Sequence, residues 1–393
     1  MATITVGGSG NWDSTTPNAP WPGGTPPTIA DAVVINNSAH VLTLKGTAME
    51  CLAITLTNGT LAIDQTGDTT LVCQNGITGA NSATSYFNWD VSASAYNHRI
   101  KTNKADTTSP DSAGGLAINN SRAVLKGATR TRWTKTTASL STSPGTSVHV
   151  ADATGWKVGD QIVFASTAAY AATPATDKVT LTSVTFDSGS TGAATIGWTG
   201  AVTNSHASGC YAGNFSSNLV VGPYTAGKGF RCVLSSNGNS VAQSIDHVLF
   251  NSAFGGSGTG GLLHIAIVSA AHPPITSISN NAFWDCASGI AMQQSRGGTT
   301  TRENNIYYTE RTDSYPMIGG GQTSYSDVGD DTDSVVFRAR YGANLNHPGL
   351  RLVRPRISGC YGYAFGPGVF DGTIVDGSIW ACAAVQNVAG GCP

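Results

Sequence analysis

Enzymes that cleave polysaccharides use paired carboxylates, or carboxylates that hold Ca²⁺ beside a basic residue. This sequence of 393 residues is poor in such groups, and only three of its 23 acidic residues are Glu. The acidic residues that gather in the sequence lie in and around the segment DVGDDTDS: Glu303, Glu310, Asp313, Asp327, Asp330, Asp331 and Asp333. The segment lacks the closing Glu and the spacing of a calcium-binding loop. We therefore interpret it as a solvated acidic loop, and we predict no catalytic residue and no metal site.

Another carboxylate, Asp160, lies in the segment DATGWKVGDQIVFAST. Gly155 suits a left-handed backbone position, and the Gly159–Asp160 pair suits a tight turn before the strand QIVFAS. We expect the Asp160 carboxylate to accept backbone N–H bonds in this turn and to take no part in chemistry.

The other residues that could do chemistry form no recognised site. The eight His are scattered, no CxxC pattern is present, and the run GGSGTGG is followed by neither a helix nor the Lys–Ser/Thr pair of a phosphate loop. We therefore predict no cofactor.

Aromatic residues are more suggestive, because sugars stack on exposed rings. Aromatic side chains recur near the C-terminal end: Trp284, Tyr307, Tyr308, Tyr315, Tyr361, Tyr363 and Trp380. Trp284, Tyr307 and Tyr308 are our candidate glycan contacts. The alternative is a core role, since alternate positions of a strand face inward.

The composition predicts an all-β protein. Only 11% of residues are charged, against roughly 25% in ordinary domains, and the chain is rich in Gly, which disfavours helices. The net charge of −2 gives no long-range attraction to nucleic acid or to an anionic membrane. Two basic stretches, KGATRTRWTK and RLVRPR, are interpreted as solvated strand faces. No apolar run reaches the ~18–20 residues of a membrane span, and no signal peptide is visible, which predicts a cytosolic origin.

The cysteines indicate how strands of such a chain would be arranged. Three pairs share a spacing of 22 residues: Cys51 and Cys73, Cys210 and Cys232, and Cys360 and Cys382. A repeat of this length in a strand-rich chain predicts a solenoid. In a parallel β-helix, each pair would stack on neighbouring coils, about 4.8 Å apart. Stacked thiols are favoured over inter-coil disulfides, which the same geometry allows.

Local patterns divide the chain into three parts. Residues 1–150 are expected to form an N-terminal cap and the first β-helix coils. Residues 151–213 are expected to hold one strand and a β-hairpin excursion with a Gly-rich tip at Gly189–Gly192. Residues 214–393 read as C-terminal coils, with Asn at corners where a left-handed conformation costs little. Within them, residues 311–350 are expected to leave the helix as a loop.

Several segments together resemble a known module. GNWDS, PPTIADAVVIN and HVLTL resemble the start, and VADATGWKVGDQIVFAST a late hallmark, of the glycine-rich β-strand module that opens many β-helix proteins. NSHASGCYAGNFSSNLVVGP is similar to the segment that leads into the following right-handed β-helix. The resemblance covers roughly residues 3–225. It implies an all-β fold, namely a right-handed, single-stranded parallel β-helix with a β-rich cap and a small β-excursion.

This module occurs in phage virion and tailspike-like proteins and in pectate-lyase-like surface proteins, so the resemblance implies a fold and not one reaction. With no export signal visible, we expect a bacteriophage virion protein, of the tail spike, fibre or baseplate type, assembled in the host cytoplasm. Expected partners are other virion subunits, further copies of the chain with a trimer favoured, and a host surface polysaccharide. A glycan-active depolymerase on the same scaffold and a non-catalytic bacterial surface adhesin are the alternatives.

Overall fold

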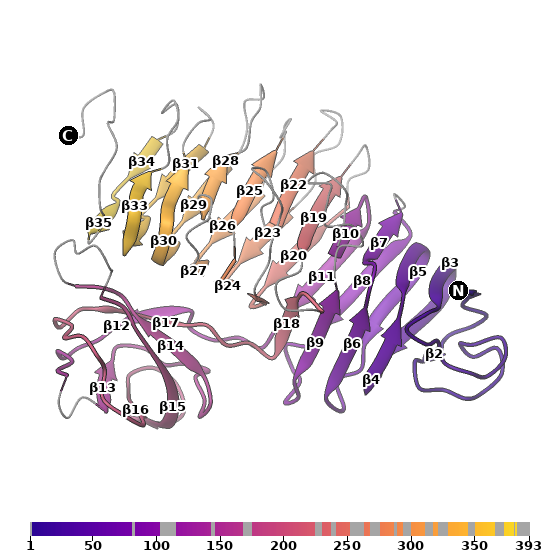
Figure 1. Cartoon of the computed structure of the whole chain (residues 1–393), viewed down its shortest axis with the longest axis horizontal. Helices are drawn as coiled ribbons and strands as arrows, with labels where there is room; N and C mark the ends of the chain where they lie inside the picture. The colour runs from indigo at the N-terminus through magenta and orange to yellow at the C-terminus, as the bar shows by residue number, and fades with distance from the viewer. Residues whose placement is uncertain are drawn as a thin grey trace.

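The computed structural model describes residues 2–80, 83–102, 115–142, 146–167, 175–224, 230–236, 241–251, 263–267, 276–286, 289–293, 300–310, 317–320, 329–344, 350–365, 373–380 and 382. These residues form strands joined by turns, and the fold is a parallel β-helix that carries a smaller antiparallel domain on its side (Figure 1). Among the described residues there is no helix with the length and apolarity of a membrane span.

The β-helix consists of three ladders of parallel strands, and each coil of the chain passes through the first, the second and then the third ladder. The first ladder contains β1 (Thr3–Thr5), the start of β3 (Ala32–Leu44), the start of β5 (Ala53–Ile63), β7 (Ile77–Ala80), β10 (Gly115–Asn119), β19 (Arg231–Ser236), β22 (Leu263–Ile267), β25 (Ile290–Gln293), β28 (Ile318–Gly320), the end of β30 (Val335–Asn344) and β33 (Cys360–Phe365).

The second ladder lies one corner further along each coil. It contains β2 (Gly10–Asn11), the ends of β3 and β5, β8 (Ser85–Asp90), β11 (Arg122–Lys126), β20 (Gln243–Asp246), β23 (Thr276–Ser279), β26 (Thr300–Glu303), β29 (Gly329–Thr332), β31 (Leu350–Val353) and β34 (Thr373–Val375).

The third ladder completes each coil. It contains β4 (Gly46–Cys51), β6 (Thr69–Cys73), β9 (His98–Thr102), β18 (Leu219–Gly222), β21 (Leu249–Asn251), β24 (Ala282–Trp284), β27 (Ile306–Tyr308), the start of β30, β32 (Arg356–Ser358) and β35 (Ser378–Trp380).

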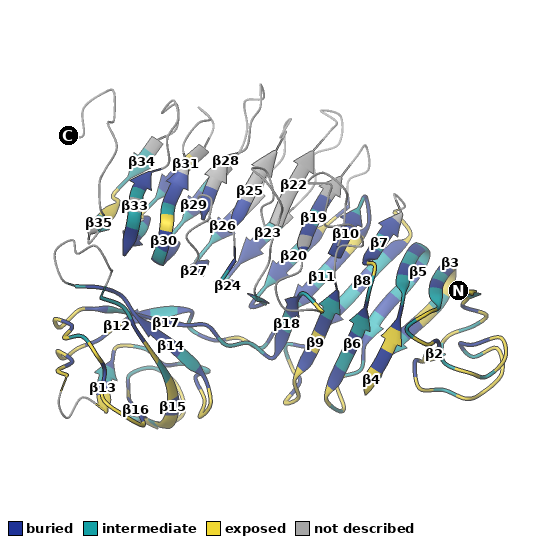
Figure 2. Cartoon of the chain, viewed as in Figure 1, coloured by how far each residue is buried: buried dark blue, intermediate teal, exposed yellow. Residues whose placement is uncertain are grey.

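Side chains alternate between the interior of the β-helix and its outer faces, as the strand geometry requires. In β5 the buried residues occupy every second position on either side of the Asn58–Gly59 corner, and Figure 2 shows this alternation along the strands. Equivalent interior residues of successive coils lie over one another: the rings of Phe250, Phe283 and Tyr307 stack with centroids 5.2 and 4.9 Å apart. A continuous apolar column therefore fills the helix.

The cysteine prediction is confirmed for one pair and wrong for another. Cys51 and Cys73 are direct register partners in the third ladder, both are buried, and both are free thiols. Cys360 and Cys382 are also thiols and interact with each other. Cys232 instead pairs in register with Leu116 and Leu263, while Cys210 lies in the antiparallel domain. The equal spacing of this last pair is a coincidence, because the chain leaves the β-helix within a coil and Cys210 belongs to the inserted side domain. Cys392 lies outside the described residues.

The corner between the second and third ladders is a column of left-handed residues. It is formed by six non-glycine residues with φ between 50° and 57°: His247, Asn280, Asn304, Asp333, Arg354 and Asp376. The residues that follow Asn280 and Asn304 are buried amides, and the Asn281 amide nitrogen donates to the Asn305 side-chain oxygen at 3.2 Å. The expectation of left-handed, stacked Asn at the corners is confirmed.

The antiparallel domain, called here the side domain, is inserted at this corner in one coil. Its six strands are β12 (Trp133–Lys135), β17 (Tyr211–Asn214), β14 (Gln161–Phe164), β15 (Asp177–Phe186), β16 (Ala194–Trp198) and β13 (Ser147–Val150), in spatial order. A bridge between Thr136 and Val150 joins the two edges of the sheet. The predicted hairpin is the β15–β16 pair, with Gly189 and Gly192 at positive φ in its tip. The predicted division at residue 150 falls within this sheet, since β12 and β13 pair with β17 and β16.

The expectation that residues 311–350 leave the helix as a loop is wrong for the described part of that segment. β28, β29 and β30 lie within it and pair in parallel with strands of the coils before and after. The two Asp residues of β29 favour a loop when only the sequence is considered. The segment nevertheless forms a strand, because pairing in a ladder depends on backbone hydrogen bonds that any side chain allows.

The N-terminal residues precede the first full coil as a small cap. Trp12 and Trp21 are buried there, with ring centroids 5.2 Å apart in an edge-to-face contact, and the Trp21 indole nitrogen donates to the Trp12 carbonyl oxygen at 2.7 Å. The cap covers the first strands of the helix with apolar rings. Without the cap, these strands would form an open sheet edge.

Candidate functional site

The side domain joins the β-helix through a narrow neck at Gly127 and Asn218. The Asn218 side chain accepts from the Ala128 backbone nitrogen at 2.7 Å and donates to the Val91 carbonyl oxygen at 3.0 Å, so it ties the outgoing and returning chain to the coil below. A side chain at Gly127 would clash with the His247 carbonyl oxygen. The whole domain is therefore inserted in place of one corner.

From this neck the side domain packs on the outer face of the third ladder. Ala282, Ile306 and Val335, register neighbours on β24, β27 and β30, point outward and are fully buried in the core of the side domain. Phe215 of the side domain packs against Phe337 with ring centroids 5.6 Å apart. Outward positions that would be polar on an open β-helix are apolar here because the side domain covers them.

This docking determines where the predicted glycan contacts lie. Tyr307 is a fully buried residue of the helix interior, and Tyr308 is 2% exposed. Trp284 is half-buried, and its ring packs on Tyr308 at 4.7 Å and on Phe215 at 5.3 Å. The structure brings these three residues together on adjacent rungs, but as packing residues inside the helix and under the side domain.

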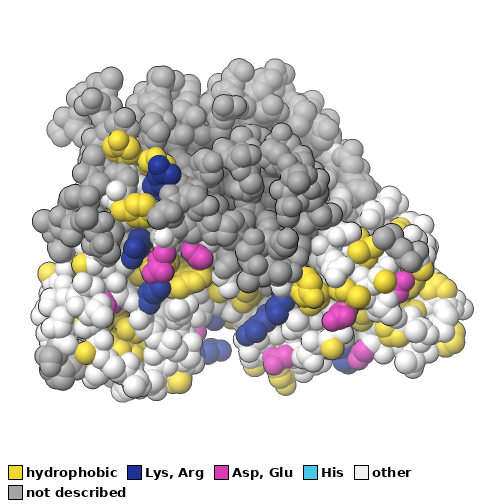
Figure 3. All heavy atoms as spheres, viewed as in Figure 1, with side chains coloured by type: hydrophobic (Ala, Val, Ile, Leu, Met, Phe, Trp, Pro, Cys, Tyr) yellow, Lys and Arg dark blue, Asp and Glu magenta, His cyan; other side chains and the backbone are white. Residues whose placement is uncertain are grey.

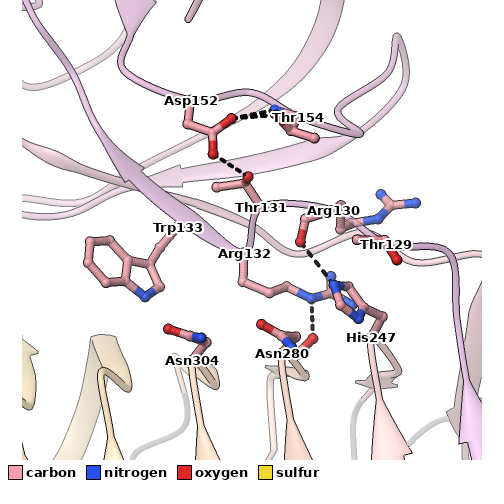
Figure 4. A pocket seen from close by; sticks show the side chains of 10 residues that line it. All are labelled: Thr129, Arg130, Thr131, Arg132, Trp133, Asp152, Thr154, His247, Asn280 and Asn304. Carbon is pink, nitrogen blue, oxygen red and sulfur yellow. Dashed lines mark hydrogen bonds between the residues drawn. The ribbon is translucent and has the colours of Figure 1, made fainter. Parts of the chain in front are cut away.

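A polar pocket of about 410 Å³, called here the joint pocket, lies between the side domain and the corner column. Figure 4 shows its walls: the segment that leaves the helix on one side and the corner residues of successive coils on the other. The pocket is lined by Thr129, Arg130, Thr131, Arg132, Trp133, Asp152, Thr154, His247, Asn280 and Asn304. Five of these belong to the basic stretch KGATRTRWTK.

The two arginines of this stretch are buried supports of the joint, so the prediction of a solvated face is wrong for them. Arg132 is 2% exposed, and its guanidinium donates to the carbonyl oxygens of Asn280, Asn214 and Ser216. Burial lowers the pKa of the Arg132 guanidinium well below its usual value, and the neighbouring Arg130 lowers it further. One of these acceptors, the Asn280 carbonyl, belongs to a left-handed corner residue, so the guanidinium joins the corner column to the side domain.

Arg130 forms a buried ion pair with Asp160, with its Nη1 3.1 and 3.2 Å from the two carboxylate oxygens. Asp160 also accepts from the Lys157 backbone nitrogen at 3.0 Å and from the Asn214 amide at 2.7 Å. The predicted role of Asp160 as a turn acceptor is confirmed. Its guanidinium partner could not be identified from the turn motif alone, because the two residues are 30 positions apart.

Trp133 and His247 extend the same joint along the corner column. The Trp133 indole nitrogen donates to the Asp333 carbonyl oxygen at 3.0 Å, and the His247 Nε2 donates to the Arg130 carbonyl oxygen at 3.1 Å. The His247 Nδ1 lies 2.8 Å from the Asp246 carboxylate. Burial raises the pKa of Asp246, but the contact with His247 and the hydrogen bond from Asn280 lower it more, so the pKa lies below its usual value.

The one carboxylate that lines the joint pocket is fully engaged. Asp152 accepts from the Thr154 backbone nitrogen at 2.9 Å, from the Thr154 hydroxyl at 2.6 Å and from the Thr131 hydroxyl at 2.8 Å. Burial would raise the pKa of Asp152, but these bonds outweigh it and hold the pKa below its usual value. Among the described residues that line the pocket, Asp152 is the single carboxylate, so these residues suit a polar ligand and include no acid and base pair of the kind that cleaves glycosides.

The acidic residues of DVGDDTDS do not converge on this or any other described site. Asp330 and Asp333 form ion pairs with Arg351 and Arg354 on the surface, and Glu310 pairs with Lys178 of the side domain at 2.8 Å. Asp331 is buried inside the helix. Asp313 and Asp327 lie outside the described residues. In the part of the chain that the structure describes, no cluster of three His, Cys, Asp or Glu residues could hold a metal ion.

No family model matches the chain, and no curated protein sequence matches it. Among solved structures, the chain is similar to the tailspike protein of Pseudomonas phage LKA1, at 12% identity and a TM-score of 0.21, over 83% of this chain and 54% of that protein. It is also similar to a tailspike of Acinetobacter baumannii bacteriophage AP22 in complex with A. baumannii capsular saccharide, at 12% identity and a TM-score of 0.20, over 82% of this chain and 53% of that protein. The chain thus spans about half the length of each.

Proposed function

We propose that the chain is a structural subunit of a bacteriophage particle, part of a tail-associated spike, fibre or baseplate, that forms a rigid rod and contacts host-surface glycan without cleaving it. The observation that carries the proposal is the architecture: three parallel ladders extend through the described chain around one apolar column. Each coil is fixed to its neighbours by backbone hydrogen bonds in three ladders around the axis, which makes the body stiff.

The docked side domain supports the same role. It is held by an apolar face, by the neck at Asn218 and by the buried Arg132, so it moves with the rod as one body. The joint pocket offers hydroxyl, amide and guanidinium groups and one indole ring, a combination suited to a sugar unit. Binding is proposed without catalysis because the pocket's one carboxylate, Asp152, is ionised and occupied by three donors.

Immunogold microscopy of purified particles tests the location. An antibody against the side domain is expected to label particles at the tail. Absence of the chain from purified particles would contradict the proposal, and its presence on uninfected bacterial cells would favour the adhesin alternative.

Incubation with purified host surface polysaccharide tests the non-catalytic contact. The polysaccharide is expected to be retained on immobilised protein with its chain length unchanged. Release of shorter oligosaccharides would contradict the non-catalytic role and favour the depolymerase alternative.

Self-assembly is part of the same proposal. A homo-oligomer, with a trimer favoured, is expected in sedimentation measurements on the chain of 40.2 kDa. A particle of one chain's mass across the micromolar range would remove this part of the proposal.

A further inference from the structure

A second hollow, called here the basic groove, lies on the outer face of the third ladder beside the docked side domain. It has a volume of about 460 Å³ and is lined by residues of three consecutive rungs: Arg99 and Lys101 of β9, Gly222 of β18 with Tyr224 after it, and Leu249 and Asn251 of β21. Leu249 also packs against the core of the side domain, so the groove begins where the docking face ends. On the face shown in Figure 3, Lys and Arg side chains lie along the boundary between the side domain and the first coils.

The groove is hollow because one rung lacks a side chain. Lys101, Gly222 and Asn251 occupy equivalent outward positions on successive coils, since Lys101 pairs in register with Gly222, and Gly222 follows Val221, the partner of Phe250. A side chain at Gly222 would meet the Asn251 carbonyl oxygen at 2.7 Å. The close approach of the next coil therefore requires glycine here, and the missing side chain leaves space between a lysine and an amide.

The groove is also positively charged. Arg99 and Lys101 face outward from the same side of β9, about 7 Å apart, and no carboxylate among the described residues lies within ion-pair distance of either. By contrast, the exposed Arg351 and Arg354 of the β-helix pair with Asp330 and Asp333. Two cations without a neighbouring anion in a concave site raise the local potential and attract an anionic ligand.

Tyr224 adds an apolar surface to the charge. Its side chain is 42% exposed and forms one wall of the groove, next to the aliphatic Leu249. A ring beside two cations and an amide fits a ligand that has an apolar face, hydroxyl groups and a negative charge. A groove of this volume lies within the usual range of roughly 300–1,000 Å³ for ligand sites.

We propose that the basic groove binds one unit of an acidic saccharide, with the sugar carboxylate between Arg99 and Lys101, a ring face on Tyr224 and a hydroxyl on Asn251. The inference deepens the glycan contact of the proposed function and rests on it for the biological source of the ligand. It distinguishes two sites on one body: the joint pocket suits a neutral polar unit, while the basic groove selects charge.

Calorimetric titration of the whole chain with a matched pair of probes tests this inference. The probes are a β-1,4-linked glucuronic acid tetramer and the glucose tetramer of the same linkage. The acidic tetramer is expected to bind at least ten-fold more tightly at low salt, and its affinity is expected to fall as salt rises because salt screens the two cations. Equal affinities for the two tetramers would overturn the inference, and this comparison needs no variant.

Charge-matched variants locate the binding. Arg99→Gln with Lys101→Gln is expected to weaken binding of the acidic tetramer at least ten-fold and to leave the glucose tetramer unaffected. The control, Arg122→Gln with Lys157→Gln, removes the same charge from exposed positions outside the groove and is expected to change affinity less than two-fold. An equal loss in both double variants would overturn the assignment to the groove.

Two further measurements complete the design. Tyr224→Ala is expected to weaken binding of the acidic tetramer several-fold; no effect would remove the ring from the site. Inorganic phosphate is expected to bind at least ten-fold more weakly than the acidic tetramer, and equal binding would overturn the saccharide assignment in favour of a phosphate-bearing ligand. If the acidic tetramer does not bind while the immunogold antibody still labels phage tails, the groove is not a saccharide site, and the proposed function remains supported.

Discussion

At the scale of single residues, two buried guanidinium groups stabilise the junction: Arg132 bonds to both domains, and Arg130 braces the side domain beside it. Arg130 neutralises Asp160 below the joint pocket, and Arg132 satisfies backbone carbonyls from both domains. A buried charge that loses its partner is costly, because the remaining charge keeps its desolvation penalty.

Replacing Arg130 by Met is therefore expected to lower the free energy of unfolding by about 3–5 kcal/mol, since it leaves Asp160 buried without its cation. Urea unfolding followed by tryptophan fluorescence measures the change. The control is Arg351→Met, whose exposed pair with Asp330 should contribute no more than about 1 kcal/mol. Equal effects of the two variants would show that the buried pair does not stabilise the side domain more than an exposed pair would.

A second residue-scale prediction concerns Asp177 in the side domain. Its carboxylate lies 2.8 Å from the His206 ring and accepts from Thr203 and Asn204. Burial would raise the pKa of Asp177, but the bonds from His206 and Thr203 outweigh it and lower the pKa below that of the unfolded chain. A depressed carboxyl pKa stabilises the fold above the unfolded value, and this contribution is lost as the pH falls.

Asp177→Asn is expected to make the acid side of the stability profile shallower below about pH 4, the usual range of a free Asp. Urea unfolding at a series of pH values measures the slope. Asp187→Asn, at an exposed carboxylate beside His149, serves as the control. An unchanged acid slope in Asp177→Asn would contradict the assignment.

At the scale of elements, the second ladder contains a charged rung in its largely apolar interior. Arg302 of β26 and Asp331 of β29 are register partners, and each is 1% exposed. Burial raises the pKa of Asp331 to about 6, and the attraction of Arg302 offsets part of that rise. Because the folded chain then holds the proton more tightly than the unfolded chain, the stabilisation by this group is lost as the pH rises from about 4 through 6.

Replacing both residues, Arg302→Leu with Asp331→Leu, is expected to leave stability at pH 7 unchanged or to raise it by about 1–4 kcal/mol, because an apolar pair continues the column. Either single replacement is expected to cost about 3–5 kcal/mol, since one charge stays buried alone. The double variant should also lose the decline in stability between pH 4 and 6. A double variant less stable than both single variants would contradict this account of the rung.

At the scale of the whole molecule, the side domain and the β-helix depend on each other through one apolar face. Ala282, Ile306 and Val335 project outward from the third ladder and are buried only because the side domain covers them. The chain crosses between the two bodies at a single point, where Gly127 and Asn218 lie close enough to be joined.

Deleting residues 128–217 and joining the neck by a short Asn-Gly turn is expected to leave a folded β-helix that self-associates through this uncovered face. Circular dichroism would show the retained strands, and light scattering would show the association. Adding Ala282→Lys, Ile306→Glu and Val335→Lys to the deletion should restore a dispersed protein. If the deletion variant without these substitutions stays dispersed and binds no apolar dye, the side domain is not needed to shield this apolar face.

Much of the fold could be predicted from the sequence, because each coil repeats the same requirements. The Cys51–Cys73 spacing, the alternation in β5 and the corner asparagines Asn280 and Asn304 all follow from residues that stack on their own equivalents one coil away. Such contacts are nearly local, since about two dozen residues separate the partners, so the pattern is visible along the chain. The Asp160 turn could also be predicted, because its donor, the Lys157 backbone nitrogen, lies only three residues away in the sequence.

The candidate sites depended on tertiary structure. The same 22-residue spacing places Cys51 beside Cys73 but not Cys210 beside Cys232, because Cys210 lies in the domain that is inserted within a coil. Alternation shows which residues point outward, but it does not show what covers them, so the sequence leaves Tyr308 open between a glycan contact and a core role, and it predicts a solvated face for Arg132, although both are buried. The sequence alone determined the stacked coils, because a repeat interacts with itself. Only the tertiary structure decided which outer faces are open, because the side domain docks on strands that follow it by more than thirty residues in the sequence.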